Sequence, residues 1–429
     1  MAHRGFAALF SPLALLLMAG LAAFHGHFTD VSPDLVREPT IDYFSRSATD
    51  PVTMLNAHLQ SGEASLAFDE SSGYLRSILN ALHVPVESQL VVFSKTSVQA
   101  SRITPRNPRA IFFNDSVAVG YIHDAPYLEF AAHDPQQGTV FYTLDQRREE
   151  KPVIERRDFC LSCHNTTSTL EVPGMLVRSI VTTPAGTTVP RFGNYTSDHR
   201  SPFAERWAGW YVNGRHGPMV HLGNAVLADR DRPDAMVTNG TLNVESLKER
   251  FDIEHYLAPH SDIVALLVFD HQMRMMNLLT RIGWDARVAL AQQRRDVAGL
   301  MAQAASDVAD YMLFVDEAPL AGPIRGSSGF AETFSAQGPS DRHGRSLRQL
   351  DLSTRLMRYP CSYMIYSDAF DMLPVEARDA VYRRLWHILS GAETDPKYAR
   401  LTASDRSAII EILGDTKKDL PVYFQPAAH

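Results

Sequence analysis

The sequence predicts an α+β fold, in which a segment containing a β-sheet is followed by a mainly helical half. Short β-branched and aromatic runs, separated by Pro, Asn, Asp and Gly, fill residues 88–144, as the strands of a small sheet would. From residue 261 onward, apolar residues recur at helical spacing through long stretches. We therefore expect an α+β region over 24–230 and a mainly helical region over 231–429 that packs on it.

The individual elements follow from local composition. The stretch 58–82 is amphipathic and partly helical, and two glycines divide it. Strands are predicted at 89–94, 110–113, 116–121, 139–144, 177–183 and 187–192. Helices are predicted at 261–293, after a cap supplied by 259–262, and at 296–314, 374–389 and 402–413. The stretch 319–344 is rich in Gly, Pro and Ser, which predicts a loop.

The N-terminus has the order of a secretory signal peptide. A short basic start is followed by an apolar run over 5–24 and by small residues. We expect export to the periplasm or beyond, with cleavage after Ala22 or Ala23, so that 1–23 is the signal. An uncleaved inner-membrane anchor is the alternative, because about twenty apolar residues suffice for one span.

Composition limits the class of partner. The chain has 429 residues, enough for a large core, and a net charge of -8. A nucleic-acid-binding protein needs a basic face, so we expect no nucleic acid as partner. Membrane contact is expected only if the N-terminal segment is an uncleaved anchor.

The most informative motif is the pentad Cys160-Leu161-Ser162-Cys163-His164. Two thiols at this spacing can each form a thioether to a haem vinyl group, and the histidine that follows can ligate the iron. The motif therefore predicts one covalent haem c, attached at Cys160 and Cys163, with His164 as proximal iron ligand. Covalent haem is generally attached outside the cytoplasm, which agrees with the export signal.

Other interpretations of the two thiols are a thioredoxin-like redox dithiol, half of a zinc site and a disulfide. A redox dithiol would open a helix, whereas the residues after the pentad are a poor helix start. Zinc would require two further ligands, and the chain has no second C-x-x-C pair. The remaining cysteine, Cys361, lies among apolar residues, so we expect a buried, inert thiol.

The second axial ligand is sought among histidines and methionines, which commonly hold haem iron. The segment 209–224 contains His216, Met219 and His221 between glycines and next to two aromatic residues. Glycine allows backbone to approach a flat cofactor closely. His221 and His216 are the candidate distal ligands, with Met219 behind them; hydrogen-bonding or surface roles are the alternative.

Several other side chains are candidates for contact with the haem, although each also has a commoner role. Met175 is near the pentad in sequence and could reach the haem edge, although packing is the commoner role of such a residue. Arg200 and Arg206 could pair with haem propionates or form ordinary salt bridges. His260 and His271 would share a helix face, and we expect them to be buried polar residues that bridge helices.

The pentad resembles that of c-type cytochromes in general. Most of the mature chain is similar to a set of uncharacterised exported bacterial proteins that contain a cytochrome c domain. The stretches that carry this similarity are 141–146, 160–164, 205–224, 259–277 and 358–363. The resemblance implies haem attachment at Cys160 and Cys163 with His164 as proximal ligand. The long exported stretch before the pentad differs from a small cytochrome c, so we do not expect that simple fold.

Two classes of function follow. The first is an exported monohaem cytochrome that transfers electrons between periplasmic redox partner proteins. The second is a haem-dependent oxidoreductase, peroxidase-like, with an open distal position and a nearby acid–base or charged side chain. A haem-based sensor or assembly subunit is a third possibility, which would explain the large part of the chain without haem.

Overall fold

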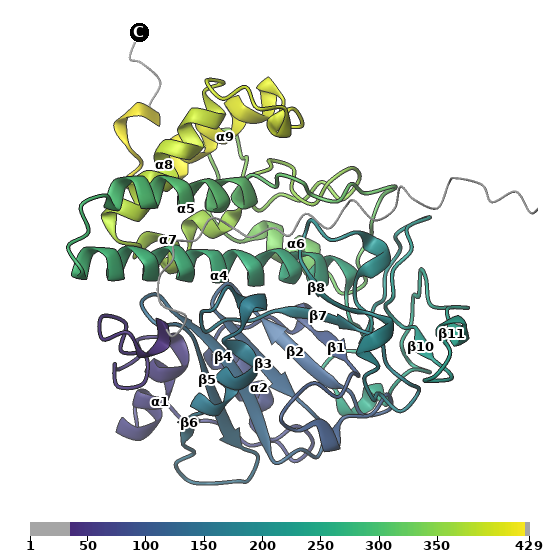
Figure 1. Ribbon diagram of the computed structural model, residues 1–429. Coiled ribbons are helices and arrows are strands. Elements are labelled where there is room, and N and C mark those ends of the chain that lie inside the picture. Colours follow the sequence, from purple (N-terminus) through teal and green to yellow (C-terminus); the bar gives the residue numbers. More distant parts are fainter. Residues whose placement is uncertain (1–34, 425–429) are drawn as a thin grey trace, which may run out of the picture.

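The computed structural model describes residues 35–424, and the predicted signal peptide lies outside this range (Figure 1). A seven-stranded antiparallel sheet carries helices on both faces, so the predicted α+β fold is confirmed. The long helices of the C-terminal half lie over one face of the sheet. This architecture is not that of a small cytochrome c. No helix within the described range is long and apolar enough to cross a membrane.

The sheet is a meander with one added edge strand. Its strand order is β6-β5-β4-β3-β2-β1-β9, and all neighbours are antiparallel. The strands are β1 Leu90–Val92, β2 Arg109–Phe113, β3 Val117–Tyr121, β4 Tyr127–Asp134, β5 Gly138–Asp145, β6 Ile154–Arg156 and β9 Trp210–Tyr211. Register fixes which side chains share a face: Gly120 of β3 pairs with Ile111 of β2 and with Glu129 of β4.

Strand alternation divides the buried side chains between two cores. On one face, Val119, Phe130 and Val140 pack in a core with helices α1 (Pro51–Ser61) and α2 (Leu75–Ala81). On the other face, Ile111 and Ala118 belong to a second core, which contains most of the C-terminal helices. The sheet is therefore buried on both sides, which explains why most residues of its central strands are apolar.

The C-terminal half is built on one long helix. Helix α4 (Ile263–Ala291) begins at Asp262, whose carboxylate accepts the backbone N–H of Val264 at 2.7 Å, an N-cap. Figure 1 shows α5 beside α4, with α8 and α9 beyond. The other helices are α5 Val297–Met312, α6 Phe330–Ala336, α7 Asp368–Asp371, α8 Val375–Leu389 and α9 Ala403–Thr416.

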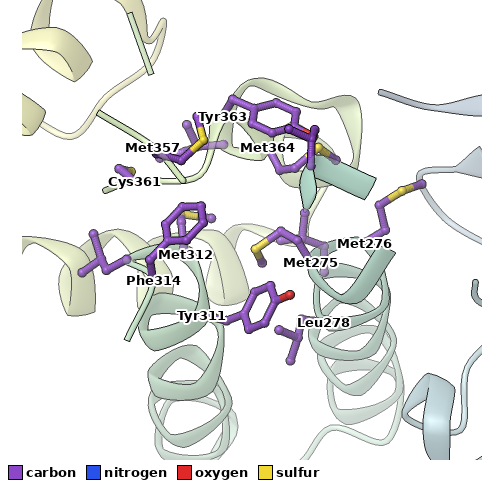
Figure 2. Close-up of a cluster of buried hydrophobic side chains, with 14 of the residues drawn as sticks. Met275, Met276, Leu278, Tyr311, Met312, Phe314, Met357, Cys361, Tyr363 and Met364 are labelled. Atoms are coloured by element: carbon purple, nitrogen blue, oxygen red, sulfur yellow. The ribbon is translucent and has the colours of Figure 1, made fainter. Parts of the chain in front are cut away.

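A sulfur-rich apolar cluster joins α4 and α5 to the segment that follows α6. Figure 2 shows Met275 of α4 and Tyr311 and Met312 of α5 below the segment that carries Met357, Cys361 and Met364. Cys361 is fully buried, and burial raises the pKa of its thiol to about 12. It is therefore a packed, protonated thiol, as the sequence predicts.

Three local predictions differ from the structure. The expected strand at 187–192 is instead a turn with a short 3-10 helix, Pro190–Phe192, and β7 (Val177–Ile180) pairs with β8 (Asn194–Ser197). Proline lacks the N–H that a ladder needs, which explains the displacement. The predicted loop 319–344 contains α6, and strand β4 was not predicted. The remaining strands, β10 Val226–Leu227 and β11 Met236–Val237, form a small separate ribbon.

Candidate functional site

The pentad lies on two consecutive short helical turns that directly follow the edge strand β6. A 3-10 turn, Asp158–Cys160, runs into the one-turn helix α3, Leu161–His164. Both cysteines are free thiols; Cys160 is half-buried and Cys163 is exposed. Burial, together with the negative charge of Glu129, raises the pKa of Cys160 to about 11, so it is a protonated thiol at neutral pH.

Cys160, Cys163 and His164 line one cavity of about 600 Å³. The rest of its wall comes from the sheet, from the loop 95–98, from β7 and from helix α4, which contributes Phe269. Ligand cavities in proteins have volumes of roughly 300–1,000 Å³. The sequence motif therefore borders a space of the size that a large organic cofactor requires.

Small side chains line the part of the sheet that borders the cavity. Ala118, Gly120 and Ala131 occupy neighbouring positions of β3 and β4 and all line the cavity. Phe141 of β5, opposite Ala131, places its ring 4.7 Å from the imidazole of His164. These small residues leave space on the sheet face that borders the cavity.

The imidazole of His164 is held by one of its two nitrogens. Its Nδ1 lies 2.9 Å from the carbonyl oxygen of Gly174, and a carbonyl can only accept, so Nδ1 carries the proton. Burial lowers the pKa of His164, and the charge of Arg109 acts in the same direction. The ring is therefore neutral, with the lone pair on Nε2. This is the tautomer in which histidine binds a metal through Nε2.

Gly174 is held against both the pentad and helix α4. Its N–H donates to the carbonyl of His164 at 2.9 Å, so the two residues are bonded reciprocally. A Cβ at Gly174 would lie 2.2 Å from Oδ1 of Asn277, whose amide donates to the carbonyl of Met175 at 2.8 Å. Gly174 and Asn277 were not among the predicted site residues; the available signal was a glycine ten residues after the histidine.

These features fit a covalent haem. Two free thiols and a neutral histidine with an available Nε2 share one cavity, which is lined by apolar residues and by several polar ones. Lys95, Arg109 and Arg178 also line the cavity and are cations of the kind that pair with propionates. At the rim, Val98 and Phe159 are 56% and 54% exposed, so the cavity opens to solvent beside the pentad.

The two candidate distal ligands do not line this cavity. His221 accepts the N–H of Gly223 at Nδ1, at 3.0 Å, and His216 accepts the N–H of Asn243 at Nε2, at 2.9 Å. Their rings pack on each other, with centroids 4.7 Å apart, and His221 packs on Trp207. Both are buried structural residues, and from the segment 209–224 only Trp210 lines the cavity. Met219 is buried in the core.

Of the other sequence candidates, Met175 lines the cavity. Arg200, Arg206 and His271 lie in a polar cluster beside α4. Arg200 pairs with Asp198 at 2.6 Å, and Arg206 lies 3.6 Å from Asp270, so both arginines have carboxylate partners away from the cavity. Neither arginine lines the cavity. His271 lies 2.8 Å from a nitrogen of His199 and 2.7 Å from Ser362, where it bridges helix and loop. His260 precedes α4 and is not part of this pair.

Comparison with known proteins gives no match to a protein-family model, a curated protein or a solved structure. Within residues 35–424, no group of three or more His, Cys, Asp or Glu side chains is arranged to hold a metal ion. A haem brings its iron already bound by the macrocycle, so a single protein nitrogen suffices on the proximal side.

Proposed function

We propose that this chain is an exported c-type haem protein that exchanges electrons with a periplasmic redox partner protein. The observation that carries the proposal is the shared cavity, in which both thiols of the pentad and His164 border a space of about 600 Å³. Neither a redox dithiol nor a disulfide accounts for a large apolar cavity beside the two cysteines.

Three residues would hold the haem: Cys160, Cys163 and His164. Each thiol would be joined to one vinyl group by addition of its S–H across the double bond, which needs no oxidant. Nε2 of His164 would hold the iron, and the Gly174 carbonyl fixes the ring and increases its basicity. The bound haem supplies a one-electron couple between ferric and ferrous iron.

Exposure at the rim supports electron exchange. Cys163 is exposed, and Val98 and Phe159 leave more than half of their surface in solvent beside the cavity. The thioether edge of the haem would thus lie near the surface, where a partner can approach. Electron-transfer encounters need only small interfaces, for which an apolar rim is sufficient.

Intact mass measurement tests the attachment. The chain should be exported in a host that matures c-type haem, then denatured and weighed. We expect one haem mass per wild-type chain. Cys160→Ala and Cys163→Ala should each retain one thioether and much less haem, and the double variant should retain none. Cys361→Ala is the matched control and should keep full haem content. A wild-type chain without added mass would refute the proposal.

A further inference from the structure

The wall of the cavity carries an excess of positive charge. Among the described residues that line it, the charged side chains are three cations, Lys95, Arg109 and Arg178, and one carboxylate, Glu129. The whole chain has a net charge of -8, so this local excess is opposite in sign to the average. Partly buried charges are costly unless a partner compensates them. The wall therefore favours a ligand that carries negative charge.

One of the three cations, Arg109, already has its counter-ion inside the wall. Nη1 of Arg109 on β2 lies 3.0 Å from Oε2 of Glu129 on β4, and both side chains are only 19% exposed. Ser97 and Gln99 donate to the other carboxylate oxygen of Glu129, which fixes the carboxylate in place. Because this pair is neutral as a unit, the excess positive charge belongs to the other two cations.

Lys95 and Arg178 have no carboxylate partner in the part of the chain that the structure describes. Nε of Arg178 donates to the amide oxygen of Asn194 at 2.8 Å, and this uncharged partner holds the guanidinium on the β7–β8 ribbon. Lys95 is half-buried, and its backbone N–H donates to the carbonyl of Gly186 at 3.0 Å. Lysine and arginine side chains are the usual partners of carboxylates, so both are available to bind acidic groups of a ligand.

These two cations and the pentad border opposite edges of the sheet. The pentad follows β6, and the ring of His164 packs on Phe141 of β5 at that edge. Lys95 follows β1, and the carbonyl of Arg178 accepts the indole N–H of Trp210 on β9 at 2.8 Å. Because the strand order is β6-β5-β4-β3-β2-β1-β9, the thiols and the two cations border distant parts of one cavity.

We propose that Lys95 and Arg178 bind the two carboxylates of the ligand that fills this cavity, and that Arg109, which is held by Glu129, does not. This inference rests on the proposed function, under which the ligand is haem and the carboxylates are its propionates. The haem molecule carries its propionates on the edge opposite its vinyl groups, which agrees with thiols at one end of the cavity and cations at the other. A few placed polar groups of this kind fix the orientation of a ligand.

Titration with haem and with its dimethyl ester tests this assignment. The full chain with Cys160→Ala and Cys163→Ala keeps His164 and the cavity but cannot attach haem covalently, so the Soret band reports an affinity. In this background, Lys95→Gln combined with Arg178→Gln should weaken haem binding about tenfold, the combined effect of two partly exposed ion pairs. The ester has no carboxylate to lose, so its affinity should change less than about twofold.

The matched control is Arg109→Gln combined with Glu129→Gln, which removes one cation and one carboxylate and leaves the net charge of the wall unchanged. The ratio of haem affinity to ester affinity should stay within about twofold of its value before these changes. Equal losses for haem and ester in the variant of Lys95 and Arg178 would overturn the inference. A selective loss of haem affinity in the control variant would also overturn it.

The covalent holoprotein provides a second measurement. A carbodiimide couples free carboxylates to an added amine, and the mass of the haem peptide after proteolysis counts the modified propionates. We expect this coupling to be several-fold slower in the wild type than in Lys95→Gln combined with Arg178→Gln, whereas equal rates would overturn the inference. A wild-type chain without covalent haem would instead refute the proposed function, so the two failures are distinguishable.

Discussion

Replacement of Gly174 by alanine tests how the proximal histidine is held. The new Cβ would lie 2.2 Å from Oδ1 of Asn277, more than about 1 Å inside van der Waals contact. Either Asn277 or the 174 backbone must move. A backbone shift of this size takes the 2.9 Å bond between Nδ1 of His164 and the Gly174 carbonyl beyond hydrogen-bonding distance. We expect a loss of about 1–3 kcal/mol in unfolding free energy.

The same change should alter the reduction potential of the holoprotein. A hydrogen bond donated by Nδ1 makes the imidazole more basic and favours ferric iron. Its loss should therefore raise the potential by tens of millivolts, and by about 59 mV if the preference for ferric iron falls tenfold. Spectroelectrochemical titration measures the potential, and urea unfolding measures the stability.

Two variants control this experiment. Gly414→Ala lies in α9 with no atom within 4 Å of the added Cβ, so it should raise stability by about 0.5–1 kcal/mol and leave the potential unchanged. Gly174→Ala combined with Asn277→Ala removes the clash. The double variant should therefore lose less free energy of unfolding than the sum of the losses in the two single variants. If Gly174→Ala behaves like Gly414→Ala in both assays, the account of the proximal side is wrong.

Four other variants probe the cavity and its surroundings. His216→Ala and His221→Ala should leave the haem spectrum unchanged. Each should lower the free energy of unfolding by about 1–3 kcal/mol, because each ring accepts a hydrogen bond from a buried backbone N–H. A spectrum that becomes high-spin would instead identify the replaced histidine as an iron ligand. Burial raises the pKa of Asp270 to about 7, so at pH 4–7 the folded state binds more protons than the unfolded state. The free energy of unfolding should therefore fall as pH rises from about 4 to 7. Asp270→Asn should flatten this pH dependence of the urea midpoint, and an unchanged slope would contradict the role given to Asp270. Ala131→Phe should fill space in the cavity and reduce haem content measured by absorbance, whereas full occupancy would place the haem elsewhere.

Much of the fold was predictable because its signals are local. The α4 helix follows from apolar spacing and from Asp262 as N-cap, and the runs that became β1, β2, β3 and β5 are apolar and β-branched. Strand β4 was missed because its Glu129 and His133 interrupt the apolar pattern. The α6 helix was missed because Gly and Ser around it suggest a loop, whereas burial of Phe330 and Phe334 stabilises it.

The site was predictable only where its residues are adjacent in sequence. The pentad needed no tertiary information, since its spacing alone indicates thioether attachment. The rest of the cavity wall comes from strands and loops that meet only in the folded chain. Local composition instead favoured His216 and His221, which do not line the cavity. Arg109 and Glu129 are twenty residues apart, and only the register of β2, β3 and β4 over Gly120 brings them together.

The pyridine haemochrome of the full chain, matured in a periplasm competent for c-type haem attachment, decides whether Cys160 and Cys163 carry haem. Its absorption band reports how many vinyl groups have become thioethers, and its intensity reports haem per chain. The account predicts one haem per chain with two thioethers, at Cys160 and Cys163. Haem that is extracted by acidic acetone, or a chain that carries none, would contradict it.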